Sequence, residues 1–174
     1  MPRMGKANQA VAETPISMVW GENTPVPGGG KVSGYRPTLL WIDDFEPGLA
    51  LYQAMFEKLG FKVLTASSGE VGVKLATFNP VDIVVTDYEM PKMNGEAVAA
   101  TIKASNPSTP VVLFSGSTLV PQRARRIVDA FCDKAASRDL LLTTIHRLLY
   151  KKRVRTLQPP PATQASDDAR RTIA

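Results

Sequence analysis

The chain has 174 residues, 44% of them hydrophobic and 21% charged, with no apolar run that approaches the roughly 18 residues of a membrane span. Its single cysteine, Cys132, excludes an intrachain disulfide, and we expect a cytoplasmic globular protein without a membrane segment. The net charge of +5 is weak evidence for nucleic-acid binding, because residues 38–150 sum to −1 while residues 1–37 and 151–174 carry +2 and +4.

Composition divides the chain into three parts. Residues 1–36 hold four prolines and three consecutive glycines without hydrophobic periodicity, which predicts a flexible N-terminal extension. Residues 37–150 carry regular apolar patterns and form the predicted domain. Residues 151–174 begin with a basic run and include three consecutive prolines, which predicts a basic, proline-rich tail.

Strands and helices are predicted to alternate along the domain. The expected strands are short apolar runs at residues 38–42, 62–66, 81–86, 111–114 and 130–133. The expected helices follow them at residues 47–59, 69–78, 95–105, 121–128 and 138–153, with N-caps at Ser67 or Ser68, Asn94 and Ser137. Strands that alternate with helices predict an α/β fold with a doubly wound, five-stranded parallel sheet of order 2-1-3-4-5.

Apolar spacing also predicts which helix faces are buried. In the first helix, Leu51, Met55 and Leu59 recur every four residues and are expected to face the core. His146 and Tyr150 of the last helix are expected on its surface. The buried face of that helix is predicted to hold Leu140, Leu141, Thr144, Ile145, Leu148 and Leu149.

Polar side chains follow four of the predicted strands. Asp43 and Asp44 follow the first strand, Asp87 the third, Ser115 the fourth and Lys134 the fifth. In a sheet of this order the carboxyl ends of the strands meet at one edge, and the first and third strands are neighbours. Crowded carboxylates repel one another unless a cation bridges them, and Mg²⁺ prefers a few carboxylates with water and phosphate oxygens. A hydroxyl and an ammonium opposite them would suit a phosphoryl group.

These features resemble the receiver domain of two-component response regulators across residues 37–150. The resemblance rests on Ile42-Asp43-Asp44, on Asp87 with Met90-Pro91 and Asn94-Gly95, on Phe114-Ser115-Gly116 and on Asp133-Lys134. It implies a flavodoxin-like fold and a phosphorylation-dependent switch that is a phosphoacceptor and not an enzyme with a separate substrate.

The resemblance implies a Mg²⁺ cofactor and a role for each acidic residue. Asp87 would accept the phosphoryl group from a sensor histidine kinase or a histidine phosphotransfer protein. Asp43, Asp44, Asp87 and the backbone carbonyl of Glu89 would bind Mg²⁺.

The remaining roles concern the signal. Ser115 and Lys134 would contact the phosphoryl group, and Ser115 and Phe131 would form the switch. The residues after Tyr150 are too few for a helix-turn-helix domain, so we expect output through protein contacts. The expected output surface is the fourth helix, the fifth strand and the fifth helix.

That surface could serve a downstream protein or a second copy of the chain. In a pairing of two copies, one basic patch would meet an acidic one. The basic patch is Arg123, Arg125 and Arg126, and the acidic one is Asp129, Asp133 and Asp139.

Two positions depart from the family pattern. Receivers usually carry a proline joined by a cis bond after the lysine, whereas this chain has Ala135-Ala136. A cis bond without proline costs roughly 2.5–4 kcal/mol, so we expect a trans bond here. Phe131 has no hydroxyl, so any switch that it makes must act through packing.

Two other functions compete with this interpretation. The domain could be a receiver-like protein-interaction module that does not use phosphorylation, and a phosphate mimic with Mg²⁺ would distinguish the two. A phosphatase of the haloacid-dehalogenase type also uses an aspartate at a strand end, but it carries a second aspartate two residues later, where this chain has Glu89. Basic residues 151–155 at a helix end are more typical of a favourable end charge than of nucleic-acid binding.

Overall fold

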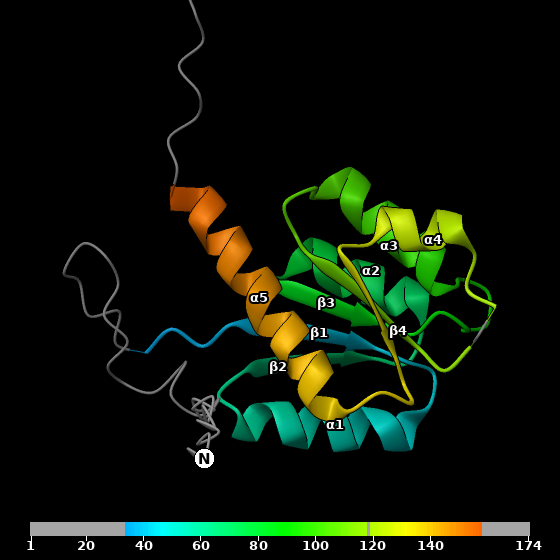
Figure 1. Ribbon diagram of the computed structural model, residues 1–174, viewed down its shortest axis with the longest axis horizontal. Coiled ribbons are helices and arrows are strands. Elements are labelled where there is room, and N and C mark those ends of the chain that lie inside the picture. Colours follow the sequence, from blue (N-terminus) through cyan, green and yellow to red (C-terminus); the bar gives the residue numbers. More distant parts are fainter. Residues whose placement is uncertain (1–33, 118, 158–174) are drawn as a thin grey trace, which may run out of the picture. The chain divides into compact units, whose positions relative to one another are not determined.

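The computed structural model describes residues 34–117 and 119–157. They contain a five-stranded parallel sheet of order β2-β1-β3-β4-β5, so the predicted fold class and strand order are confirmed (Figure 1). The predicted features of residues 1–33 and 158–174 lie outside the described residues. Within the described part, no helix is both long and apolar enough to cross a bilayer.

The elements follow the predicted alternation closely. The strands are β1 (Thr38–Ile42), β2 (Lys62–Ala66), β3 (Ile83–Thr86), β4 (Val111–Ser115) and β5 (Ala130–Asp133). The helices are α1 (Glu46–Lys58), α2 (Gly69–Phe78), α3 (Gly95–Ser105), α4 (Gln122–Ile127) and α5 (Arg138–Leu157). Side-chain oxygens of Ser68 and Asn94 cap α2 and α3, and Ser137 accepts a hydrogen bond at the start of α5.

The sheet is buried on both faces because helices cover each side of it. Side chains alternate along a strand, so Leu39 and Trp41 of β1 pack toward α1 and α5. Leu40 and Ile42 pack on the opposite face, in a cluster with residues of α2 and α3. Figure 1 shows α1 and α5 on one side of the sheet and α2 and α3 on the other. All five residues of β1 are buried, as expected for a central parallel strand.

The predicted buried face of α1 is wrong. Leu51 and Leu59 are exposed, and only Met55 packs partly against the core. The buried positions are instead Leu49 and Phe56, because the helix is rotated to place these side chains against Trp41 of β1. Leu49 and Phe56 are seven residues apart, which is two helical turns, so the buried stripe is on another face of the helix than predicted.

Helix α5 departs from prediction at two points. Leu140 is exposed, while the other five residues predicted on its buried face are buried. The helix also continues to Leu157, four residues beyond the predicted end at residue 153. Lys152 holds this end in place, because its ammonium donates to the carbonyl oxygens of Val81 and Asp82 at 3.1 Å each.

His146 is half-buried and not a plain surface residue, since its ring stacks on Phe61 at 5.9 Å between centroids. Burial lowers its pKa below the ordinary value. The unfolded chain therefore binds this proton first as the pH falls. The stability that the neutral ring contributes is complete above its unfolded pKa of about 6.5 and is lost as the pH falls from there toward the folded pKa.

We expect His146→Gln to reduce the loss of stability on acidification, because His146 is the only histidine of the chain. Urea unfolding midpoints of wild type and variant, measured between about pH 7.5 and 5, give the comparison. The two pH profiles should converge toward low pH. Parallel profiles would mean that His146 has the same pKa in the folded and unfolded states.

Candidate functional site

The carboxyl ends of β1 and β3 lie side by side and carry the acidic residues. Ile42 of β1 is in register with Thr86 of β3, so the next residues along the two strands are Asp43 and Asp87. The N–H of Asp87 donates to the Ile42 carbonyl oxygen at 2.8 Å. The hydrogen bonds between the two strands therefore continue one residue past the end of β3. Both aspartates therefore sit on rigid backbone at the edge of the sheet.

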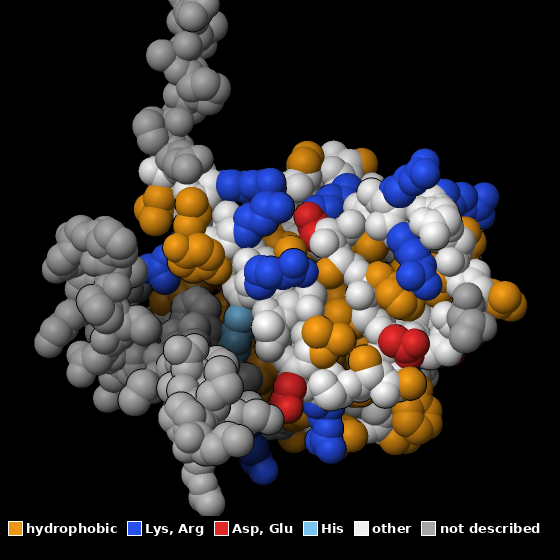
Figure 2. Space-filling view, viewed as in Figure 1, with side chains coloured by type: hydrophobic (Ala, Val, Ile, Leu, Met, Phe, Trp, Pro, Cys, Tyr) orange, Lys and Arg blue, Asp and Glu red, His pale blue; other side chains and the backbone are white. Residues whose placement is uncertain are grey.

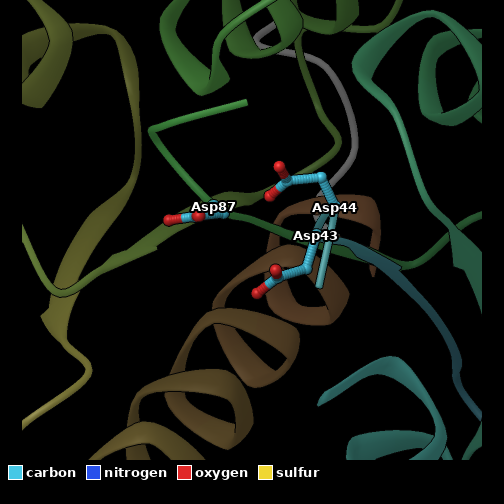
Figure 3. A group of neighbouring side chains, drawn as sticks. All are labelled: Asp43, Asp44 and Asp87. Carbon is cyan, nitrogen blue, oxygen red and sulfur yellow. The ribbon is translucent and has the colours of Figure 1, made fainter. Parts of the chain in front are cut away.

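Asp43, Asp44 and Asp87 form one acidic cluster. Each offers a carboxylate oxygen, and these oxygens all lie within 4.8 Å of one another. Figure 3 shows the three side chains projecting to the same side of the strand ends. Asp43 and Asp87 are only 3% and 8% exposed, whereas Asp44 is exposed. Two of the three carboxylates are thus fixed within the fold, and the carboxylate of Asp44 is accessible to solvent.

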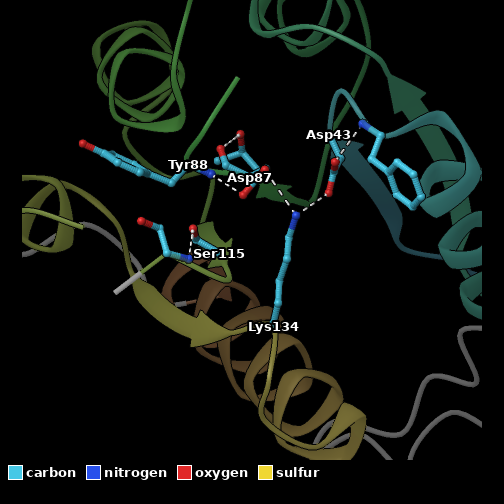
Figure 4. A network of polar contacts seen from close by, with 8 residues as sticks. Asp43, Asp87, Tyr88, Ser115 and Lys134 are labelled. Carbon is cyan, nitrogen blue, oxygen red and sulfur yellow. Dashed lines mark hydrogen bonds and ion pairs between the residues drawn. The ribbon is translucent and has the colours of Figure 1, made fainter. Parts of the chain in front are cut away.

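Lys134 bridges two of these carboxylates. Its Nζ lies 2.9 Å from Oδ2 of Asp43 and 3.2 Å from Oδ2 of Asp87 (Figure 4). Among the described residues no peptide bond is cis, which confirms the trans bond expected after Lys134. The alanine that follows Lys134 therefore does not keep its ammonium from the acidic cluster.

The pKa values of Asp87 and Lys134 are both shifted by this arrangement. Burial raises the pKa of Asp87 above its ordinary value, and the charge of Asp43 adds to the effect, while Lys134 and the Tyr88 N–H oppose it. Burial alone would lower the pKa of Lys134, but the hydrogen bond and charge of Asp43, with the charge of Asp87, raise it overall. The site thus holds a charged lysine against carboxylates whose negative charge it only partly offsets.

The donor set fits a Mg²⁺ ion. Mg²⁺ binds oxygen ligands at about 2.1 Å, so ligand oxygens on opposite sides of it lie about 4.2 Å apart. One carboxylate oxygen of each aspartate lies within 4.8 Å of the others, so small side-chain movements would bring the three within reach of one ion. A divalent cation would also relieve the repulsion that helps to raise the pKa of Asp87. Asp43, Asp44 and Asp87 are the side chains that would hold the ion.

Ser115 is brought to the same edge of the sheet but makes other contacts. Its side chain is buried, and its Oγ accepts a hydrogen bond from the N–H of Ser117 at 3.1 Å. Its carbonyl oxygen accepts from the N–H of Lys134 at 3.0 Å, which links the ends of β4 and β5. The hydroxyl is therefore beside the site and already positioned by the following loop.

Among the described residues, neither Phe131 nor the side chain of Glu89 bonds to the carboxylates. The ring of Phe131 is partly buried in a cluster with Leu113 and Tyr88, and the guanidinium of Arg125 lies 3.9 Å from its centroid. Glu89 is exposed. The structure thus connects Phe131 to the site only through neighbours such as Tyr88.

Three contacts at the site are not evident from the sequence pattern. The N–H of Tyr88 donates to Oδ1 of Asp87 at 2.7 Å. The ammonium of Lys134 lies 5.9 Å from the ring centroid of Phe114, and Tyr52 of α1 packs edge-on against that ring. An apolar residue just before Ser115 and an aromatic one in α1 are signals too general to identify these neighbours in advance.

The expected charged patches are partly used within the domain. Arg123 pairs with Glu96 of α3 at 2.9 Å. Asp129 pairs with Lys103 of α3 and accepts a hydrogen bond from the N–H of Val111 at 2.8 Å. These contacts hold α4 and the start of β5 against α3, so Arg123 and Asp129 are less available for a second copy than predicted.

Known proteins with similar sequences include a sensor kinase/phosphatase and a transcriptional regulator. The response regulator receiver domain family matches residues 39–146, more than half of the chain. The autoinducer 1 sensor kinase/phosphatase LuxN of Vibrio campbellii is 31% identical over 119 residues, which are 68% of this chain and 14% of that protein. The cell cycle transcriptional regulator CtrA of Caulobacter vibrioides is 25% identical over 118 residues, 66% of this chain and 51% of that protein. The chain thus spans about half or less of the length of these relatives.

Solved structures agree with the sequence comparison. A response regulator receiver domain protein of Clostridium thermocellum superposes with a TM-score of 0.64 at 27% identity and covers 68% of this chain and 98% of its own. The response regulator protein TrrA of Thermotoga maritima, solved in complex with Mg²⁺ and BeF, gives a TM-score of 0.62 at 23% identity and covers 64% of this chain and 98% of its own. With its parallel sheet, its acidic cluster and its bridging lysine, the chain belongs to the response regulator receiver domain family.

Proposed function

We propose that the domain is a phosphorylation-dependent switch in which Asp87 accepts a phosphoryl group with the help of Mg²⁺. The observation that carries the proposal is the position of Lys134, whose ammonium contacts Asp43 and Asp87 inside a cluster of three carboxylates. The donor would be a sensor histidine kinase or a histidine phosphotransfer protein of the cytoplasm. A Mg²⁺–BeF complex of TrrA, a protein of the same fold, supports the assignment by analogy.

In the proposed reaction a carboxylate oxygen of Asp87 attacks phosphorus, and the bond from phosphorus to the donor nitrogen breaks. Bound Mg²⁺ would neutralise charge on the phosphoryl oxygens. Lys134 would exchange part of its contact with Asp87 for a phosphoryl oxygen, and the Ser115 hydroxyl would donate to another. The backbone carbonyl of Glu89 would complete the Mg²⁺ ligands from the chain.

The second candidate is an interaction module that does not use phosphorylation. It has one observation in its favour, because Lys134 contacts both buried carboxylates and offsets part of their repulsion. A static network of this kind could serve stability alone. It leaves Asp44 without a role, since its exposed carboxylate contributes nothing to that network. We therefore favour the switch.

Labelling with acetyl phosphate separates the two candidates. The proposed switch should form an acyl phosphate with Mg²⁺, at one aspartate per chain, and no adduct when the metal is chelated. Mass spectrometry after hydroxylamine treatment locates the modified residue, because hydroxylamine cleaves acyl phosphates but not phosphoserine. No adduct under any condition, together with no binding of beryllofluoride, would leave the interaction module as the better candidate.

Asp44→Ala tests the metal site separately from the phosphoacceptor. We expect Mg²⁺ affinity to fall by about tenfold or more, because one of three charged ligands is removed from a site that has few others. The fold should be unaffected, since Asp44 is exposed. Trp41 lies one residue before the end of β1, so its fluorescence in a Trp20→Phe background can report the titration. Glu57→Ala, which removes an exposed carboxylate of α1, is the control and should leave the titration unchanged.

For output we propose contacts of α4, β5 and α5 with a downstream protein or with a second copy of the chain. Arg125 and Arg126 are exposed on α4, and Asp133 and Asp139 are exposed near β5 and the start of α5. Arg123 and Asp129 are engaged with α3, so the available charge is smaller than the sequence indicates. A downstream protein is therefore the better fit of the two.

A further inference from the structure

The C-terminal half of α5 carries two surface stripes that lie beyond the charged residues proposed above for output. Residues four apart on a helix lie on one face, so each stripe is a line of neighbours. Figure 2 shows Lys and Arg side chains beside hydrophobic ones along this half of the helix. We call the two stripes together the α5 face. Its basic stripe is Arg147, Lys151 and Arg155, and its apolar stripe is Tyr150, Val154 and Leu157.

The apolar stripe has large exposed side chains that do not help to form the core of the domain. Tyr150 is 70% exposed and Leu157 is 75% exposed, while Val154 between them is half-buried. Both follow the last buried residue of the helix, Leu149, so they contribute little to the core. Large apolar side chains that are exposed next to one another are typical of a contact surface.

The basic stripe is also without a counter-charge. Arg147, Lys151 and Arg155 are exposed and make no ion pair within the part of the chain that the structure describes. Residues 147–157 contain no Asp or Glu. The α5 face therefore has apolar area and positive charge, but no negative charge of its own.

The face is held in a fixed position by contacts at the opposite side of the helix. Lys152 donates to the carbonyl oxygens of Val81 and Asp82, and its ammonium lies 3.6 Å from the Asp82 carboxylate. Asp82 in turn accepts from the N–H of Thr38 at 2.8 Å, which ties the same group to β1. A helix that is anchored in this way presents its outer face at little entropic cost on binding.

We propose that the α5 face is a docking site for an acidic, amphipathic helix of a partner protein. The apolar residues of such a helix would cover Tyr150, Val154 and Leu157, and its flanking carboxylates would meet the basic stripe. This mode uses both stripes at once, as helix recognition does when apolar anchors are flanked by complementary charges.

Other occupants match the face less well. A second copy would place basic stripes against each other in a symmetric contact. The chain's own ends lack the required charge, since residues 1–36 sum to +2 and residues 158–174 to zero. Nucleic acid would use the basic stripe but leaves the apolar one unexplained. Membrane-surface helices bury a broad apolar face, whereas this one is a single line that includes a tyrosine.

The test uses two designed peptides of three helical turns, about 11 residues each, with leucines at i, i+3, i+4 and i+7. One peptide carries glutamates beside the leucines, and the other carries lysines at the same positions. Fluorescence anisotropy with the full chain should show binding of the acidic peptide only, weaker at high salt. Amide chemical shifts should move at residues 147–157. The Asp87→Asn variant should bind equally, so this result is independent of the phosphorylation proposal.

Two double variants test the two stripes separately, and a third double variant is the control. Lys151→Glu with Arg155→Glu should weaken the acidic peptide by about tenfold or more and create binding of the lysine peptide. Tyr150→Ser with Leu157→Ser should weaken the acidic peptide without a change in charge. Lys58→Glu with Lys74→Glu makes the same charge change at exposed positions of α1 and α2 and should leave binding unchanged.

Several results would overturn the proposal. These are equal binding of the two peptides, no binding of either, or the same loss of affinity in the Lys58/Lys74 control. Tighter binding of anionic phospholipid vesicles or of duplex DNA than of the acidic peptide would reassign the face to that ligand. Light scattering that shows a dimer lost in the Tyr150/Leu157 variant would reassign it to a second copy.

Discussion

Asp87→Asn is expected to abolish acyl-phosphate labelling completely and to leave the domain at least as stable as wild type. The first result follows because asparagine has no carboxylate to attack phosphorus, and the neighbouring Asp43 is engaged by Lys134 at 2.9 Å. Asparagine still offers an oxygen to the N–H of Tyr88, which donates to Oδ1 of Asp87 in the wild type. The loss of labelling should therefore not come from a change of fold.

The second result follows from the direction of the Asp87 pKa shift. Burial raises this pKa, so the folded domain binds the proton more tightly than the unfolded chain. Stability linked to Asp87 is then greatest below its unfolded pKa of about 3.9 and declines as the pH rises through the folded pKa. At neutral pH the charged side chain is a cost, and a neutral asparagine removes it.

The matched control is Asp82→Asn, since Asp82 lies at the opposite end of β3. Its carboxylate accepts from the N–H of Thr38 and lies near the ammonium of Lys152. We expect this variant to be labelled like wild type but to unfold at lower urea concentration. Labelling of Asp87→Asn at the wild-type level would show that the acyl phosphate forms elsewhere in the chain.

The sequence was sufficient to predict the fold and the cluster because both depend on strand ends. Each short apolar run gave a strand, and the parallel order brought Asp43 beside Asp87, as expected. Lys134 entered the same cluster although the residue after it is alanine. Position along a parallel strand thus determines the place of a side chain more firmly than the loop residue that follows it.

Helix faces were less predictable, because several faces of a helix can satisfy the same spacing. In α1, Leu51 and Leu59 fit a buried stripe, but packing against Trp41 selected Leu49 and Phe56 instead. In α5 the length was underestimated because the contact that fixes its end, from Lys152 to the start of β3, spans distant parts of the chain. Ion pairs such as Lys103 with Asp129 depend on the same kind of long-range information.

Gly95→Ala should destabilise the domain by about 2–4 kcal/mol and also impair phosphorylation. Gly95 begins α3, and its N–H donates to the Tyr88 carbonyl oxygen at 2.9 Å. A Cβ at this position would overlap the backbone carbonyl oxygen of Asp87 and lie 2.8 Å from Cδ1 of Leu113. The overlap concerns backbone, so it cannot be relieved by a side-chain rotation.

Neither partner of this contact can move without disturbing the site. Asp87 is fixed by the hydrogen bond from its N–H to the Ile42 carbonyl oxygen, and Leu113 is fully buried. A shift of Asp87 would displace its carboxylate from Lys134, so acetyl phosphate labelling of the folded fraction should slow as well. Gly48→Ala is the control, because the atoms nearest to a Cβ there belong to the ring of Phe45, which is exposed and can rotate away. It should cost less stability and leave labelling unchanged, and equal losses in the two variants would show that the approach of Gly95 to Asp87 has no special role.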